Sequence, residues 1–84
     1  MKIIYNTRFI REYKKLPGKI ITKAQKIITT LEKNPFNPIL KTHKLNGKLK
    51  NFYACNIDYS YRIIFEIEND KIKLLSTGDH DIYE

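Results

Sequence analysis

The chain has 84 residues, with 16 Lys/Arg against 9 Asp/Glu and a single cysteine. This length predicts one domain spanning residues 1–84. The lone cysteine is not typical of a disulfide-stabilised secreted domain, and no run approaches the ~20 apolar residues of a membrane span, so we expect a cytoplasmic protein without a membrane partner.

Positive charge is concentrated in the first part of the chain. Residues 1–50 carry 13 Lys/Arg and 2 Asp/Glu, a net charge of +11, whereas residues 51–84 carry 3 and 7, a net charge of −4. A basic half of this kind favours binding to a polyanion such as nucleic acid, or to an acidic protein. A solvated, lysine-rich helix surface explains the same composition equally well.

The first half of the sequence predicts a strand followed by two helices. Residues 2–5 (KIIY) are short, apolar and β-prone. Asn6 or Thr7 can cap a helix over residues 7–16. A Pro-Gly break at 17–18 separates it from a second helix. The apolar stripes that define the two helices are Phe9, Ile10, Tyr13 and Leu16, then Ile20, Ile21, Ala24, Ile27, Ile28 and Leu31.

The second half predicts a basic loop and three antiparallel strands. The prolines of NPFNP (34–38) end the second helix, and residues 39–50 form the loop. Strands are predicted at 51–57, 61–68 and 71–78, joined by tight turns. The fold class is therefore α+β, in the order β-α-α-β-β-β. A helix hairpin packs on one face of a mainly antiparallel four-stranded sheet.

The strand at 61–68 predicts which face of the sheet is left uncovered. Tyr61, Ile63, Phe65 and Ile67 share the more apolar face, which should lie under the helices. Arg62 then points to the opposite face. If Asn69-Asp70 is a two-residue turn, Arg62 lies opposite Thr77, and His80 falls at the same end of the sheet.

Four side chains from three segments could together cleave RNA without a metal: His43, Arg62, His80 and Tyr83. Histidine can accept or donate a proton near neutral pH, and arginine suits the charge on a phosphate. Tyrosine can stack on a base or transfer a proton. Each also has a structural alternative: Arg62 can pair with Glu66, and the other three can be ordinary loop or terminal residues.

Other chemistries find no support in the sequence. Two histidines 37 positions apart and one cysteine do not make a zinc site, and there is no phosphate-binding Gly loop or nucleophile motif. Cys55 falls in mid-strand on the face expected to be buried, where cysteines are inert packing residues. We therefore predict no metal and no cofactor.

The whole sequence resembles the RelE/ParE superfamily of toxins from bacterial type II toxin–antitoxin systems, and within it the YafQ-like branch. The resemblance is carried by HKLNGKLKNFYACNI, YRIIFEI and STGDHDIYE, that is, H-x-L-x-G, Y-R-[ILV]-[ILV]-[FY] and a closing G-x-H. It implies the fold derived above, cleavage of mRNA in the ribosomal A site, and silencing by an antitoxin that wraps the toxin.

The resemblance also implies roles for individual residues. The catalytic histidines of YafQ-like proteins fall on His43 and His80, the phosphate-contacting arginine of the wider nuclease group on Arg62, and a C-terminal aromatic on Tyr83. Four residues are predicted to contact RNA: Lys44, Lys48, Lys50 and Asn56. Ala54 and Asn56 stand where nuclease members often carry lysine or histidine. The alternatives are a ParE-like inhibitor of DNA gyrase and an inactive domain that only binds its antitoxin.

Overall fold

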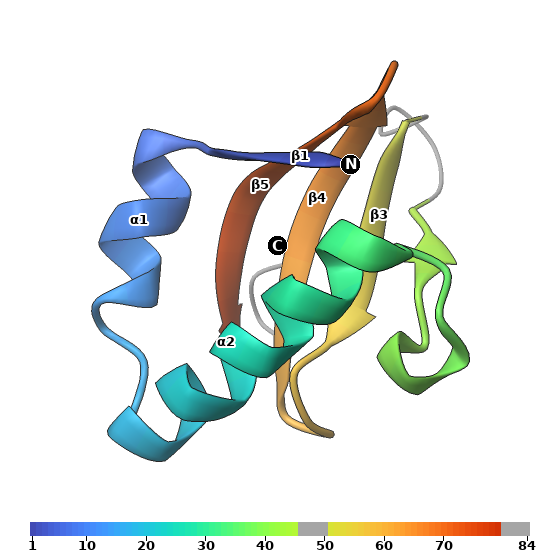
Figure 1. Cartoon of the computed structure of the whole chain (residues 1–84). Helices are drawn as coiled ribbons and strands as arrows, with labels where there is room; N and C mark the ends of the chain where they lie inside the picture. Colours follow the sequence, from blue (N-terminus) through green and yellow to red (C-terminus); the bar gives the residue numbers. More distant parts are fainter. Residues whose placement is uncertain (46–50, 80–84) are drawn as a thin grey trace.

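The protein, described here by a computed structural model over residues 1–45 and 51–79, consists of two layers (Figure 1). A five-stranded sheet in the order β1-β5-β4-β3-β2 carries two helices on one face. β1 is parallel to β5, and the other pairs are antiparallel. This confirms the predicted α+β class. The elements are β1 (Lys2–Tyr5), α1 (Thr7–Tyr13), α2 (Gly18–Lys33), a 3-10 helix (Pro38–Leu40), β2 (His43–Lys44), β3 (Phe52–Asn56), β4 (Tyr61–Glu68) and β5 (Lys71–Asp79).

The sheet has one strand more than predicted. His43 pairs with Ala54 and Lys44 with Tyr53, so part of the predicted basic loop is the edge strand β2. Two residues are too few to produce a readable alternation of apolar and polar side chains, which is why the sequence did not reveal this strand.

Helix α1 begins and ends for local reasons. The Asn6 side chain accepts a hydrogen bond from the Arg8 N–H at 2.8 Å, which caps the first turn. The helix ends at Tyr13, three residues earlier than predicted. The Lys15 and Leu16 N–H groups donate to carbonyls three residues back, so the chain tightens before Pro17. Neither helix in the described ranges is both long and apolar enough to cross a membrane.

The core lies between the helices and one face of the sheet. From β4, Ile63 and Phe65 are completely buried, as the strand pattern predicts. They pack with Phe9 of α1 and Ala24 of α2, and Phe65 stacks on Tyr53 of β3 at a ring separation of 5.8 Å. Figure 1 shows α2 crossing this face while α1 lies beside β5. Within the part of the chain that the structure describes, no helix covers the opposite face of β4.

The register between β4 and β5 differs from the prediction. Phe65 pairs with Leu74, as expected, but Ile64 pairs with Ser76, so Leu75 is an extra residue on β5. The resulting β-bulge shifts every later pair by one position, and Arg62 lies opposite Gly78 instead of Thr77. A tight turn fixes the pairing of its two strands only as far as the first β-bulge. The alternation of apolar and polar residues does not show where a bulge falls.

Glu12 joins α1 to the free edge of β5. β1 pairs with β5 only as far as Leu74, so beyond that point no strand of residues 1–45 or 51–79 pairs with this edge. There the Glu12 carboxylate accepts hydrogen bonds from the Ser76 hydroxyl at 2.7 Å and the Thr77 N–H at 3.3 Å. This contact holds the last part of β5 in place, next to the end of β4 that carries Arg62.

Candidate functional site

Arg62 lies on the face of the sheet away from the helices, near the start of β4. It pairs with Asn56 of β3 on one side and with Gly78 of β5 on the other. Residues paired across neighbouring strands share a face, and Ile63, the next residue, points into the core. Arg62 and Asn56 are therefore neighbours on the side of the sheet away from the helices. This confirms the face of the sheet predicted for Arg62.

His43 lies on the same face, one strand further out. It pairs with Ala54, and Ala54 pairs with Ile64. Arg62 and His43 are thus two strands and two residues apart, a Cα separation of about 12 Å from ideal sheet spacings. The His43 ring is exposed, and its Nδ1 lies 3.4 Å from the Lys41 carbonyl oxygen. A hydrogen bond there requires the proton on Nδ1, which leaves Nε2 able to accept a proton.

Of the remaining predicted residues, Lys44 lies within the described ranges and is not part of this cluster. Lys44 is exposed, but it pairs with Tyr53, a residue of the helix-facing side, and so points away from His43. His80, Tyr83, Lys48 and Lys50 lie outside the described residues. Because of the bulge, the partner of Arg62 is Gly78, and His80 is two residues beyond Gly78 in the sequence.

The contacts of Arg62 also bear on its structural alternative. One guanidinium nitrogen, Nη1, donates to the backbone carbonyl of Tyr59 at 3.3 Å, and Arg62 has further interactions. Glu66, the partner expected in the structural alternative, forms an ion pair with Lys73 of β5 at 3.7 Å. The backbone contact orients one edge of the guanidinium toward the β3–β4 turn.

Cys55 is unsuited to covalent catalysis. Its side chain is completely buried, and this burial raises the pKa of the thiol from 9.0 to about 12, opposed only by a hydrogen bond with the Ile63 backbone. A thiol with such a pKa is protonated at neutral pH and is a poor nucleophile. Within residues 1–45 and 51–79, no three His, Cys, Asp or Glu side chains are grouped as they would be to hold a metal ion.

The turn between β3 and β4 presents an exposed tyrosine that the sequence analysis did not single out. Tyr59, at its tip, is 89% exposed, and with Asn56 and Lys41 it lines a shallow pocket of 190 Å³ beside Arg62. A tyrosine inside the polar run DYS was the available signal. Its exposure could be known only from the turn geometry.

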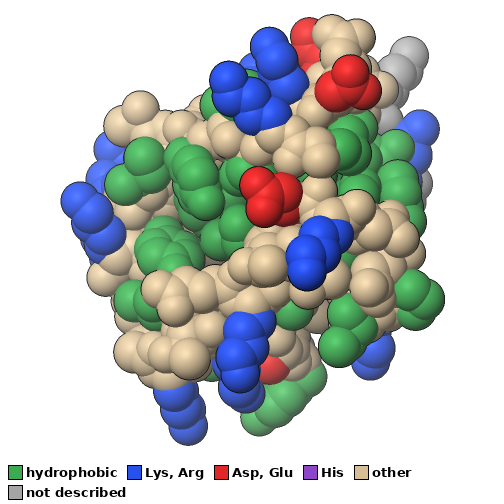
Figure 2. Space-filling view, in the orientation of Figure 1, with side chains coloured by type: hydrophobic (Ala, Val, Ile, Leu, Met, Phe, Trp, Pro, Cys, Tyr) green, Lys and Arg blue, Asp and Glu red, His purple; other side chains and the backbone are tan. Residues whose placement is uncertain are grey.

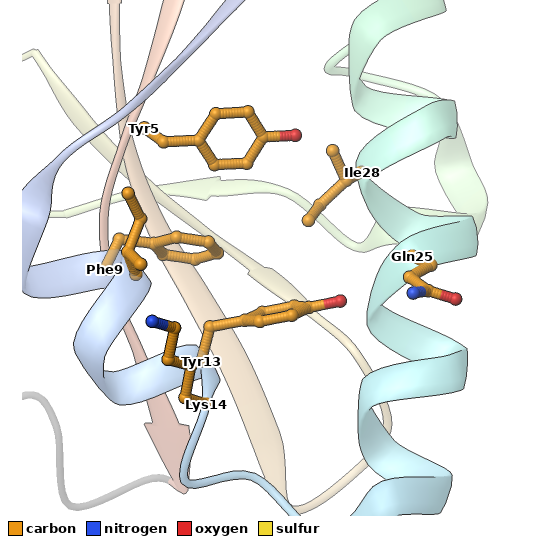
Figure 3. A pocket seen from close by; sticks show the side chains of 7 residues that line it. Tyr5, Phe9, Tyr13, Lys14, Gln25 and Ile28 are labelled. Atoms are coloured by element: carbon orange, nitrogen blue, oxygen red, sulfur yellow. The ribbon is translucent and has the colours of Figure 1, made fainter.

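A second surface, the α1–α2 groove, lies on the other side of the molecule. It is a pocket of 470 Å³ lined mainly by aromatic and aliphatic side chains, and the Tyr5 and Tyr13 rings lie across it toward α2 (Figure 3). Figure 2 shows hydrophobic side chains exposed on this face, with Lys and Arg side chains around them. Its lining residues are Tyr5, Phe9, Ile10, Tyr13, Lys14, Gln25 and Ile28.

The family to which these features belong is settled by comparison with known proteins. Residues 1–83 match the model of the family described as the bacterial toxin of type II toxin–antitoxin system, YafQ. The chain belongs to the YafQ toxin family. The match confirms the family resemblance read from the sequence.

This YafQ-family toxin has recognisable relatives. The toxin RelK of Mycobacterium tuberculosis is 24% identical over 62 residues, which cover 74% of this chain and 73% of RelK. The crystal structure of YafQ from E. coli superimposes with a TM-score of 0.83 at 19% identity, covering 98% of this chain and 96% of that one. The E. coli DinJ-YafQ toxin-antitoxin complex gives a TM-score of 0.81 at 19% identity, with coverage of 96% and 93%. These two structures share its fold.

Proposed function

We propose that this YafQ-family toxin is a ribosome-dependent mRNA endoribonuclease that acts in the cytoplasm. The supporting observation is the pairing of β2, β3 and β4, which gathers His43, Asn56 and Arg62 on the face without helices. In this proposal Arg62 is the cation that holds a phosphate, and His43 is the imidazole that takes a proton. Both residues belong to strands of one sheet, which fixes their backbones. Such a platform suits positioning-dependent chemistry on RNA.

The proposed reaction uses the RNA itself as nucleophile. The 2′-oxygen attacks the adjacent phosphorus, a new O2′–P bond forms, and the P–O5′ bond breaks. The Nε2 of His43 accepts the proton of the 2′-hydroxyl, and His80 donates a proton to the departing O5′. Arg62 holds the phosphate, whose oxygens carry more negative charge in the transition state than in the ground state. Asn56, which cannot transfer a proton at neutral pH, serves as a hydrogen-bonding partner for RNA.

The basic first half of the chain fits the proposed ribosome and mRNA partners. Its charge of +11 would neutralise phosphates, and each neutralised phosphate releases counterions. Lys48 and Lys50 lie in the sequence between His43 and the start of β3. Lys44, in contrast, faces the other side of β2. Lys44 is therefore proposed to contact ribosomal RNA outside the reacting nucleotides.

Induction of the toxin in bacteria tests the function directly. Protein synthesis should stop within minutes, and mapping of mRNA 5′ ends should show new ends at fixed positions within codons of translated reading frames. A ParE-like gyrase inhibitor would instead cause DNA damage signalling and leave mRNA intact. An inactive antitoxin-binding domain would do neither. Either of the last two results would contradict the proposal.

The proposed protein partner is a cognate antitoxin, which binds the α1–α2 groove. The groove offers aromatic and aliphatic side chains of which Tyr5 and Ile10 are about half exposed. Residues 7–33, which form the two helices, carry eight Lys/Arg and only two Asp/Glu. An amphipathic antitoxin segment with apolar anchors and acidic flanks is complementary to this surface.

Ile10→Lys tests the docking surface without disturbing the core, because Ile10 is 42% exposed. It should weaken antitoxin binding by about tenfold or more, since it places a charge in an apolar contact. Cleavage by the free toxin should be unchanged. A full-strength complex with Ile10→Lys would place the antitoxin elsewhere.

A further inference from the structure

The two most exposed large hydrophobic side chains in the described part of the chain meet in one pocket. Tyr59 is 89% exposed and Ile39 is 69% exposed, and both line the pocket of 190 Å³ next to Arg62. The two residues are 20 positions apart, one in the β3–β4 turn and one in the 3-10 helix. Exposed apolar side chains that converge from separate elements mark a binding surface more strongly than scattered single ones.

The turn that carries Tyr59 is tightly fixed. The Asp58 carboxylate oxygen Oδ1 accepts hydrogen bonds from the N–H groups of Ser60 at 2.8 Å and Tyr61 at 2.9 Å. The Ile57 N–H donates to the Tyr61 carbonyl at 2.8 Å, which closes the turn. Tyr59 is therefore held outward by its backbone, and its ring is available to a ligand at little further cost in backbone entropy.

The other groups in the pocket are those that a nucleotide needs. Asn56 supplies an amide that can donate to and accept from the edge of a base, and Lys41 supplies a cation. The charge of Asp58 is balanced by Lys23, whose Nζ lies 3.8 Å from Oδ2, so it repels RNA less than an unpaired carboxylate would. The pocket is smaller than the roughly 300–1,000 Å³ of sites for drug-sized molecules and is suited to one base.

The pocket is also joined to the proposed reaction centre. Asn56 is the cross-strand partner of Arg62, and the Tyr59 carbonyl accepts a hydrogen bond from the Arg62 guanidinium at 3.3 Å. A phosphate held by Arg62 would therefore lie close to the backbone of the turn that carries the Tyr59 ring. Flat aromatic side chains next to cations are the usual way in which proteins hold unpaired RNA bases.

We propose that Tyr59, Ile39, Asn56 and Lys41 form a nucleobase subsite that holds the mRNA base next to the scissile phosphate. The base stacks on the Tyr59 ring and against Ile39, Asn56 bonds to its edge, and Lys41 contacts the backbone on its far side. This inference rests on the proposed nuclease function and adds to it a determinant of which nucleotides are cut.

Three variants test the subsite on purified ribosomes programmed with short mRNAs that differ in the bases flanking the cut. Tyr59→Ala removes the ring and should raise KM by between about fivefold and about 150-fold, because stacking on an aromatic side chain contributes roughly 1–3 kcal/mol. It should leave kcat nearly unchanged, since stacking is the same in the ground and transition states. Tyr59→Phe keeps the ring and should match the wild type. Asn56→Ala should weaken discrimination among bases at one flanking position.

The possible outcomes separate the subsite from the function on which it rests. Normal KM and base preference in Tyr59→Ala, with a wild type that cleaves, would overturn the subsite and leave the nuclease intact. Normal cleavage with weaker antitoxin binding would overturn it in favour of a protein contact at Tyr59. A wild type that cuts no mRNA on ribosomes would overturn the nuclease, and the subsite with it.

Discussion

The two faces of the sheet in this small toxin carry different kinds of side chain, and β4 contributes to both. Ile63 and Phe65 point toward the helices and are completely buried, whereas Arg62 points to the other face beside Asn56. The first face has the aromatic and aliphatic packing that stabilises an 84-residue chain. The second has hydrogen-bonding and titratable groups on a fixed frame. Substitutions on the two faces should therefore have opposite signatures, one in stability and the other in activity.

The largest effect is expected on the covered face. Phe65→Ala should lower the free energy of unfolding by about 3–5 kcal/mol, because it opens a cavity where the ring packs on Tyr53. Urea denaturation followed by circular dichroism measures this loss. Activity should fall only in proportion to the folded fraction. A loss of activity in the folded fraction itself would show that the two faces are not independent.

The two histidines proposed to transfer protons should show the reverse signature. His80→Gln should slow cleavage by about a hundredfold or more while ribosome binding stays nearly normal, because glutamine keeps the size but cannot transfer a proton. His43→Gln should show a loss of the same kind. Cleavage rates on programmed ribosomes and a binding assay on the same preparations separate the two steps. Unchanged cleavage would remove that histidine from the mechanism.

Much of this division can be predicted from the sequence. The alternation Tyr61–Glu68 fixes the two faces of β4, and the helical stripes predict what covers one of them. The β2 strand and the bulge at Leu75 were missed, since both depend on pairing with a neighbouring strand. For the same reason Arg62 was placed opposite Thr77 instead of Gly78, and the exposure of Tyr59 was not foreseen. His43 and Arg62 are predicted from chemistry and family resemblance, which need no register.

A smaller effect is expected at the buried thiol, and it depends on pH. Burial raises the pKa of Cys55 from 9.0 to about 12, so above pH 9 the unfolded chain loses this proton before the folded one does. Stability should therefore fall with rising pH between these values, by up to about 1.4 kcal/mol per pH unit. Unfolding free energies of the wild type and Cys55→Ala at about pH 8 and pH 10 measure it. Equal pH dependence in both proteins would contradict the assignment.

The smallest effect is expected at the ion pair between Glu66 and Lys73. Their charged groups are 3.7 Å apart and the lysine is 41% exposed, so Glu66→Gln should change stability by less than about 1 kcal/mol. Cleavage should be unchanged as well. If this variant instead impaired cleavage as strongly as a change at Arg62, the two residues would act as a pair.

The role proposed for Arg62 in holding the phosphate is tested most directly by the activity of Arg62→Ala per folded molecule. A fixed guanidinium stabilises the transition state more than the ground state, so its removal should slow cleavage on programmed ribosomes by about a hundredfold. Arg62→Lys should recover only part of this loss, because lysine is a point charge without the planar fork. The melting temperatures of all three proteins should be similar. A clear drop in melting temperature with a normal cleavage rate per folded molecule would contradict the central claim and make Arg62 a structural residue.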